Sequence, residues 1–130
     1  LFIEPFLRGY EIYCFWRYIW KNKGVMKQIN PIIFNKKINN KQDFQLIDIR
    51  EEYEYDICCI GGDKISMYSI PDCIDKISRT KDVIIYCRTG SRSATIVKML
   101  EDSYSFDNVY NLDGGIMRWR EDVDIELKEY

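Results

Sequence analysis

One cysteine stands in a short segment whose other side chains could support chemistry at sulfur. Residues 84–93 read IIYCRTGSRS, so Cys87 is followed by two arginines, a glycine and two hydroxyl residues: Arg88, Thr89, Gly90, Ser91 and Arg92. Nearby positive charge favours the thiolate over the thiol, and the thiolate is the nucleophilic form of cysteine. We therefore interpret Cys87 as a nucleophile, against the alternative of an ordinary buried cysteine that ends a core strand.

The residues on either side of this segment predict a strand, a tight loop and a helix. Residues 83–86 are apolar and mostly β-branched, which is typical of a strand buried on both faces. An amphipathic helix should follow, capped near Ser91 or Ser93 and carrying Ala94, Val97 and Leu100. Because the N–H groups at the start of a helix point toward the preceding loop, we expect them to converge beside Cys87.

Strand and helix alternate through most of the chain, which predicts an α/β domain with a largely parallel sheet. Further strands are expected at 25–29, 44–49, 65–70 and 108–112. Helical segments are expected after Asn30-Pro31 and Pro71, near 53–60 and at 116–121. Ligands of such sheets bind beyond the carboxyl ends of the strands, so Asp48, Cys87 and Leu112 should face one crevice.

Composition limits the chemistry that this domain can carry. The chain has 130 residues and no histidine, which excludes Ser-His-Asp and Cys-His catalysis and histidine-ligated zinc. Its five cysteines show no disulfide-framework or paired CxxC spacing, so we expect a reducing cytoplasm and neither a metal nor another cofactor. A net charge of −2 gives no general attraction to nucleic acid or to anionic membranes.

Three segments differ in composition. Residues 1–24 are rich in aromatic side chains and form an N-terminal extension, which we expect to pack against the domain or a twin subunit. The extension has no apolar run of the roughly 20 residues that a membrane span needs, and no signal-peptide layout. Residues 25–122 form the α/β domain, and residues 123–130 are expected to be a mobile, charged C-terminal tail.

Three motifs together resemble those of a single rhodanese domain: LIDIREEYEY (46–55), IIYCRTGSRS (84–93) and NLDGGIMRW (111–119). The resemblance runs from about residue 25 to residue 122. It implies a three-layer fold with a mostly parallel five-stranded sheet flanked by helices. It also implies a sulfurtransferase, in which Cys87 takes a sulfane sulfur from a donor such as thiosulfate, holds it as a persulfide and passes it to a thiophilic acceptor.

The resemblance further implies roles for individual residues. The loop from Cys87 to Arg92 should bind a small anionic sulfur donor, with backbone amides cradling the persulfide. The acceptor would be a thiol or a sulfur-carrier protein. Asp48 and Arg50 match the family's Asp-x-Arg; we expect them to form a charge pair that fixes the end of a strand, with direct substrate contact as the alternative.

The chain departs from the family's pattern after Tyr55. Residues 58–63 read CCIGGD where the family usually has Gly-His-Ile-Pro-Gly-Ala, and this variant resembles rhodanese domains fused behind enzymes that adenylate sulfur carriers. Cys58 and Cys59 could supply a second thiol that resolves a persulfide, but packing is the favoured interpretation. The Gly114-Gly115 pair is interpreted as a turn, and Trp119 as a core aromatic residue.

Two other classes of function stay open at this point. Phosphatases and arsenate reductases also place a cysteine in an anion-binding loop closed by an arginine. Their loops put five residues between the two, whereas four residues separate Cys87 from Arg92, which makes a tighter loop that suits sulfur. A non-catalytic binding module arises when the family's cysteine is lost, and here the cysteine is present.

Overall fold

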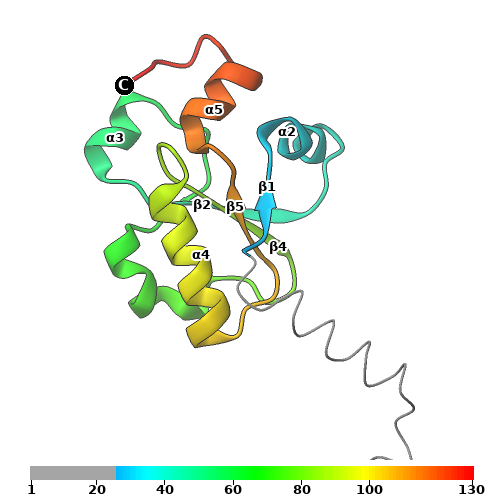
Figure 1. Cartoon of the computed structure of the whole chain (residues 1–130), viewed down its shortest axis with the longest axis vertical. Coiled ribbons are helices and arrows are strands. Elements are labelled where there is room, and N and C mark those ends of the chain that lie inside the picture. Colours follow the sequence, from blue (N-terminus) through cyan, green and yellow to red (C-terminus); the bar gives the residue numbers. More distant parts are fainter. Residues whose placement is uncertain (1–25) are drawn as a thin grey trace, which may run out of the picture.

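A five-stranded sheet organises residues 26–130, the part of the chain that the computed structural model describes (Figure 1). Its strands lie in the order β1-β5-β4-β2-β3, and every neighbouring pair is parallel. In chain order they are β1 (Gln28–Ile29), β2 (Phe44–Asp48), β3 (Asp63–Lys64), β4 (Asp82–Tyr86) and β5 (Val109–Leu112). The predicted parallel sheet is confirmed. The aromatic extension predicted at 1–24 lies outside the described residues.

Four helices in the described part of the chain connect the strands: α2 (Pro31–Asn39), α3 (Glu52–Ile57), the 3-10 helix η1 (Met67–Lys76) and α4 (Ser91–Tyr104). A further helix, α5 (Gly115–Asp122), follows the last strand. Helix α2 begins as predicted, because the Asn30 side chain accepts a hydrogen bond from the Ile33 N–H at 2.8 Å. Among residues 26–130 there is no helix with the length and apolar character that crossing a membrane requires.

The predicted strand at 65–70 is wrong, and so is the helix expected to start at Pro71. Ile65 and Met67 still donate backbone hydrogen bonds to the carbonyls of Asp48 and Ile49, at 3.0 and 3.1 Å. The Ser66 hydroxyl then accepts from the Tyr68 N–H and begins η1, which contains Pro71 in its interior. A local serine cap therefore ends the extended segment earlier than the apolar pattern indicated.

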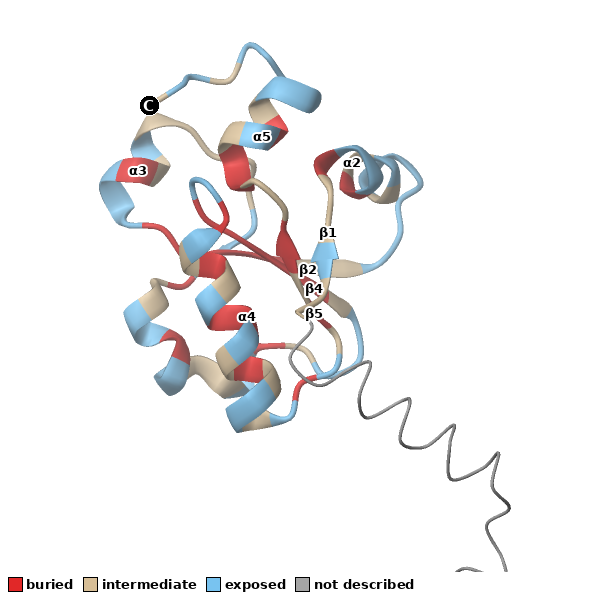
Figure 2. Cartoon of the chain, in the orientation of Figure 1, coloured by how far each residue is buried: buried red, intermediate tan, exposed pale blue. Residues whose placement is uncertain are grey.

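Alternate residues of the central strands serve two separate cores, one on each face of the sheet. Leu46, Ile84 and Tyr86 pack in one core with side chains of α2 and α5. Their neighbours in the strands pack in the other core with side chains of α4 and η1. Figure 2 shows the buried sheet between these helices, in red. Burial on both faces is why these strands read as continuous apolar runs. Trp119 belongs to the first core, as predicted.

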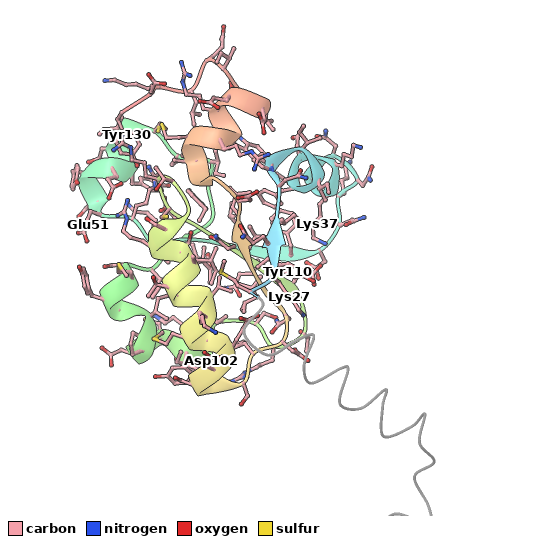
Figure 3. The ribbon with its side chains drawn as sticks, viewed as in Figure 1. Lys27, Lys37, Glu51, Asp102, Tyr110 and Tyr130 are labelled. Carbon is pink, nitrogen blue, oxygen red and sulfur yellow. The ribbon has the colours of Figure 1, made fainter. Side chains whose placement is uncertain are left out.

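The last eight residues fold back onto the domain, whereas a mobile tail was expected. Val123, Leu127 and Tyr130 pack against the core that α2 and α5 cover. The Arg120 side chain also donates a hydrogen bond to the Leu127 carbonyl at 2.7 Å. The chain ends beside α3, where Tyr130 is labelled in Figure 3 (compare Figure 1). Apolar packing and hydrogen bonds together hold this segment on the domain.

Candidate active site around Cys87

Cys87 lies in a tight loop between β4 and α4, directly beyond the carboxyl end of the central strand. The residue is fully buried. Gly90 ends the loop in the left-handed region, with φ of 98°, and is the N-cap residue of α4 without a side-chain hydrogen bond. The predicted strand, loop and helix are present, and the helix begins near Ser91 as expected. The capping residue is Gly90 and not a serine, because glycine takes the positive φ that the turn requires.

Three hydrogen-bond donors converge on the sulfur of Cys87. The Gly90 N–H lies 3.1 Å from Sγ, the Ser93 N–H 3.4 Å and the Ser93 hydroxyl oxygen 3.3 Å. We call these three groups the sulfur cradle. Donors fixed around one point stabilise negative charge there without having to reorganise. Within residues 26–130 no cluster of cysteine or acidic side chains is arranged to hold a metal ion.

Backbone N–H groups at the start of helix α5 hold the Cys87 loop through two hydrogen bonds. The Ile116 N–H donates to the Cys87 carbonyl at 2.9 Å, and the Met117 N–H to the Arg88 carbonyl at 3.1 Å. Gly115 has φ of 64°, and a Cβ atom there would lie 2.4 Å from the Arg88 carbonyl oxygen. The glycine pair thus does more than turn the chain. The position of the glycine pair at the start of a helix was the available signal for such a close approach.

Asp48 and Arg50 form the charge pair that the motif suggested. Arg50 Nε and one terminal nitrogen bind the two carboxylate oxygens at 3.0 and 2.9 Å, and both side chains are buried. The remaining donors of Arg50 bind the carbonyls of Glu54 and Cys58 and the Tyr130 hydroxyl. Burial alone would lower the pKa of Arg50, but the hydrogen bonds with Asp48 and Tyr130 raise it. All its donors are used within the protein.

Arg92, expected to bind substrate, forms a two-pronged ion pair with Glu54. Its terminal nitrogens lie 2.7 and 2.8 Å from the two carboxylate oxygens, and Glu54 is only 2% exposed. Hydrogen bonding to Arg92, with a smaller part from Tyr130, lowers the pKa of Glu54 from 4.5 to about 2. Glu54 was not predicted as a site residue, since nothing in the local sequence distinguishes it from the acidic residues beside it.

We call Asp48, Arg50, Glu54, Arg92 and Tyr130 the charged cluster. Tyr130 joins its two halves, because its hydroxyl accepts from Arg50 at 2.8 Å and donates to a Glu54 oxygen at 2.7 Å. Burial raises the pKa of Tyr130 to about 12. Tyr86 contributes a further hydrogen bond to Asp48 at 2.9 Å. The cluster ties β2, α3, α4 and the C-terminal segment together beside the loop.

The remaining loop side chains, Arg88, Thr89 and Ser91, point to solvent. The Arg88 guanidinium carbon lies 4.9 Å from the centre of the Tyr130 ring, and one of its nitrogens donates to the Tyr130 carbonyl. Arg88 therefore stays at the surface beside the loop. The two arginines that follow Cys87 in the sequence therefore differ: Arg88 is exposed at the surface, and Arg92 is paired with Glu54.

The other cysteines of the described chain are free and partly buried: Cys58, Cys59 and Cys73. Cys58 packs against the core under α5, and Cys73 against the core on the other face of the sheet. Cys59 hydrogen-bonds with Tyr55, which raises the pKa of that phenol. These contacts fit the packing role that was favoured for Cys58.

Comparisons with known proteins agree with this geometry. The family model of the rhodanese-like domain matches residues 33–122. The putative sulfurtransferase YtwF of Bacillus subtilis is 33% identical over 95 residues, which cover 72% of this chain and 90% of that protein. The rhodanese-like/PpiC domain-containing protein 12 of Arabidopsis thaliana is 34% identical over 91 residues, 66% of this chain but only 30% of that longer protein.

A solved structure shows the same fold. The crystal structure of a rhodanese-like domain protein from Staphylococcus aureus superposes with a TM-score of 0.68 and 27% identity, covering 81% of this chain and 99% of that one. The parallel sheet, the loop after the central strand and the family-model match lead to one conclusion. The chain belongs to the rhodanese-like domain family.

Proposed function

We propose that the protein is a sulfurtransferase that carries a sulfane sulfur on Cys87 as a persulfide. The observation that carries this proposal is the convergence of two backbone N–H groups and one hydroxyl on Cys87 Sγ. The name of the Bacillus relative, whose length this chain nearly spans, supports the same reaction class.

In the first half of the reaction, the Cys87 thiolate attacks the outer sulfur of thiosulfate. A new S–S bond forms to Sγ, the S–S bond of thiosulfate breaks, and its electron pair leaves with sulfite. The negative charge moves from Sγ to the outer sulfur of the persulfide. No proton is transferred, which is consistent with a chain that contains no histidine.

In the second half, an acceptor such as cyanide or a thiolate attacks the outer sulfur and restores the Cys87 thiolate. A protein thiolate, including a cysteine thiolate of a sulfur-carrier protein, would act in the same way as cyanide. The exposed Arg88 is the loop's cation that an approaching anionic donor can reach, whereas the terminal nitrogens of Arg92 are bound to Glu54. We assign Arg88 to donor attraction and Arg92 to holding the loop.

Phosphate-ester hydrolysis is the competing reaction class. The four-residue spacing between Cys87 and Arg92, together with the pairing of Arg92 to Glu54, argues against a loop that wraps the oxygens of a phosphate. A non-catalytic module would bind a partner and show neither activity. Assays of thiosulfate:cyanide transfer and of aryl phosphate hydrolysis on one preparation distinguish the three.

The deciding experiment uses Cys87→Ser, with Cys73→Ser, a partly buried free cysteine of η1, as the matched control. We expect Cys87→Ser to abolish transfer and to retain the thermal unfolding transition, while Cys73→Ser loses some stability and keeps turnover. Incubation with thiosulfate should add one sulfur atom to the Cys87 peptide. Wild-type transfer rates in Cys87→Ser, or wild-type protein that takes no sulfur from thiosulfate, would overturn the proposal.

A further inference from the structure

Two buried polar side chains contact each other under the loop. Ser93, in the first turn of α4, is 0% exposed, and Asn111, on β5, is 3% exposed. The Ser93 hydroxyl oxygen lies 2.5 Å from Asn111 Oδ1 and 3.3 Å from Cys87 Sγ. Residues from two different elements thus meet directly beneath the reactive sulfur.

The orientation of the Asn111 side chain follows from the loop backbone. Its amide nitrogen donates to the Gly90 carbonyl at 3.2 Å. The opposite orientation would place two acceptors against each other. Asn111 therefore presents its carbonyl oxygen to Ser93, and a carbonyl oxygen can only accept.

The Ser93 hydroxyl has one proton and three acceptors within reach. They are Asn111 Oδ1 at 2.5 Å, Cys87 Sγ at 3.3 Å and the Gly90 carbonyl at 3.3 Å. The Gly90 carbonyl already accepts from the Ala94 N–H and from Asn111, so the effective competition is between Asn111 and the sulfur. While the proton points to Asn111, the hydroxyl turns a lone pair toward Sγ.

With the Ser93 proton pointing to Asn111, the hydroxyl lone pair is compatible with a neutral Sγ and repels a negatively charged one. A thiol or an inner persulfide sulfur is neutral, and a lone pair beside it does no harm. A thiolate draws the hydroxyl proton, because hydrogen bonds to charged acceptors are the stronger ones. The move leaves the buried Asn111 oxygen without its donor, which is unfavourable.

We propose that Ser93 and Asn111 form a proton switch that responds to the charge on Cys87 Sγ. Ser93 contacts the reacting sulfur, and Asn111 is a positioning residue that acts through it. The switch favours states with neutral Sγ, so it resists the thiolate and helps to retain sulfur as a persulfide. The part about retention rests on the proposed function, whereas the part about charge does not.

The charged groups around the loop do not duplicate this switch. Arg92 of α4 is paired with Glu54 of α3, and Asp48 of β2 with Arg50. Arg88 is exposed, and the phenols nearby are Tyr86 and Tyr130. Among the described residues, the side chains of Ser93 and Asn111 hydrogen-bond only to each other, to the Gly90 carbonyl and to Sγ.

The test measures the iodoacetamide reactivity of Cys87 against pH, read on its own peptide by mass spectrometry. Asn111→Ala frees the Ser93 proton for the thiolate and should move the reactivity midpoint down by about one pH unit. Ser93→Ala removes a donor and should move it up. Since the Asn111 carbonyl oxygen reaches Sγ only through the Ser93 hydroxyl, the midpoint of the double variant should come close to that of Ser93→Ala.

Asn108→Ala is the matched control, because this amide precedes the same strand and holds the carbonyls of Ser78 and Lys81. It should lower the melting temperature and leave the midpoint unchanged. If Asn111→Ala does not fold, Asn111→Leu removes the same oxygen in a similar shape. Midpoints that move in the same direction for the Ser93 and Asn111 variants, or additive shifts in the double variant, would overturn the switch.

A second readout tests retention. At fixed thiosulfate and sulfite concentrations, the persulfide-to-thiolate ratio of Cys87 should fall about tenfold in Asn111→Ala, the ratio that corresponds to one pH unit. An unchanged ratio with a shifted midpoint would overturn retention and leave the charge switch in place. A protein that takes no sulfur would overturn the proposed function, while the alkylation result would still decide the switch.

Discussion

The two sides of the Cys87 loop handle charge in opposite ways. In the sulfur cradle Cys87 Sγ faces only neutral groups, which are two backbone N–H donors and the Ser93 hydroxyl that it shares with Asn111. In the charged cluster four ionised side chains are buried or half-buried, and each is matched to an opposite charge. Under the proposed function, backbone and hydroxyl dipoles therefore serve the chemistry, and the paired full charges hold the framework.

This separation changes how the arginines of the motif are understood. Two arginines beside a cysteine indicate that positive charge activates the thiolate. Arg92, however, directs both terminal nitrogens at Glu54, so most of its charge is compensated. Fixed dipoles stabilise an anion without the desolvation cost of a buried cation. Substitutions in the cradle and in the charged cluster test this division.

Gly115→Ala should disrupt the cradle most strongly. The new Cβ would lie 2.4 Å from the Arg88 oxygen and 2.6 Å from the Cys87 oxygen, at a positive φ. We expect a loss of about 3–5 kcal/mol from strain and overpacking and an almost complete loss of sulfur transfer. Urea unfolding and the thiosulfate assay measure the two effects.

Gly61→Ala is the control for this change, because Gly61 also has a positive φ but nothing lies within 4 Å of the added Cβ. It should cost only about 1–2 kcal/mol and keep activity. Equal losses at the two glycines would mean that the contact between α5 and the loop is unimportant.

Glu54→Gln tests the charged cluster. Arg92 would lose its counter-charge, and we expect a loss of about 2–3 kcal/mol in stability at pH 7. The pKa of Glu54 in the folded protein is about 2, below the ordinary 4.5. The Glu54 carboxylate therefore contributes its full stabilisation of the fold above pH 4.5. Its contribution disappears as the pH falls through about 2. Denaturant unfolding at pH 7, 4.5 and 3 should therefore show a shrinking difference from wild type.

Glu52→Gln on the same helix is the control, since Glu52 is exposed and should matter little at any pH. A Glu54→Gln effect that stays constant down to pH 3 would show that charge is not the cause of the loss.

Arg88→Ala tests whether an exposed charge, in contrast to the paired ones, attracts the donor. We expect the KM for thiosulfate to rise about fivefold at low salt, equivalent to about 1 kcal/mol. The effect should shrink at high salt, because exposed charges are screened over about 10 Å at 0.1 M. Arg79→Ala removes an equally exposed charge on another side of the domain and should leave KM unchanged. A salt-independent change in kcat would contradict this role.

Tyr130→Phe should give the smallest effect. It removes the hydroxyl that joins Arg50 to Glu54, and we expect a loss of about 1 kcal/mol in stability with little change in turnover. With its pKa raised from 10 to about 12, Tyr130 contributes fully below pH 10, and its contribution is lost as the pH rises through about 12. Thermal unfolding should show the same difference in stability between Tyr130→Phe and wild type at pH 7 and at pH 9. The control Tyr53→Phe changes an exposed tyrosine and should not change stability. A large loss of transfer would link the tail directly to the chemistry.

Local patterns in the sequence were sufficient for the framework of the site. Apolar runs predicted the buried parallel strands, and the segment from Cys87 to Arg92 predicted the loop between strand and helix. The pairing of Asp48 with Arg50 was also predictable, because two positions along one strand end leave the side chains within reach. Each of these features depends on residues close together in the chain.

Tertiary structure alone decided which partners complete the site. Glu54 meets Arg92, and Tyr130 meets both Arg50 and Glu54, across separations of 38, 80 and 76 residues. Asn111 reaches Ser93 because β5 lies beside β4, a neighbour relation that follows from the strand order. The sequence pattern is periodic and local, whereas the choice of counter-charge and proton acceptor depends on which elements pack together.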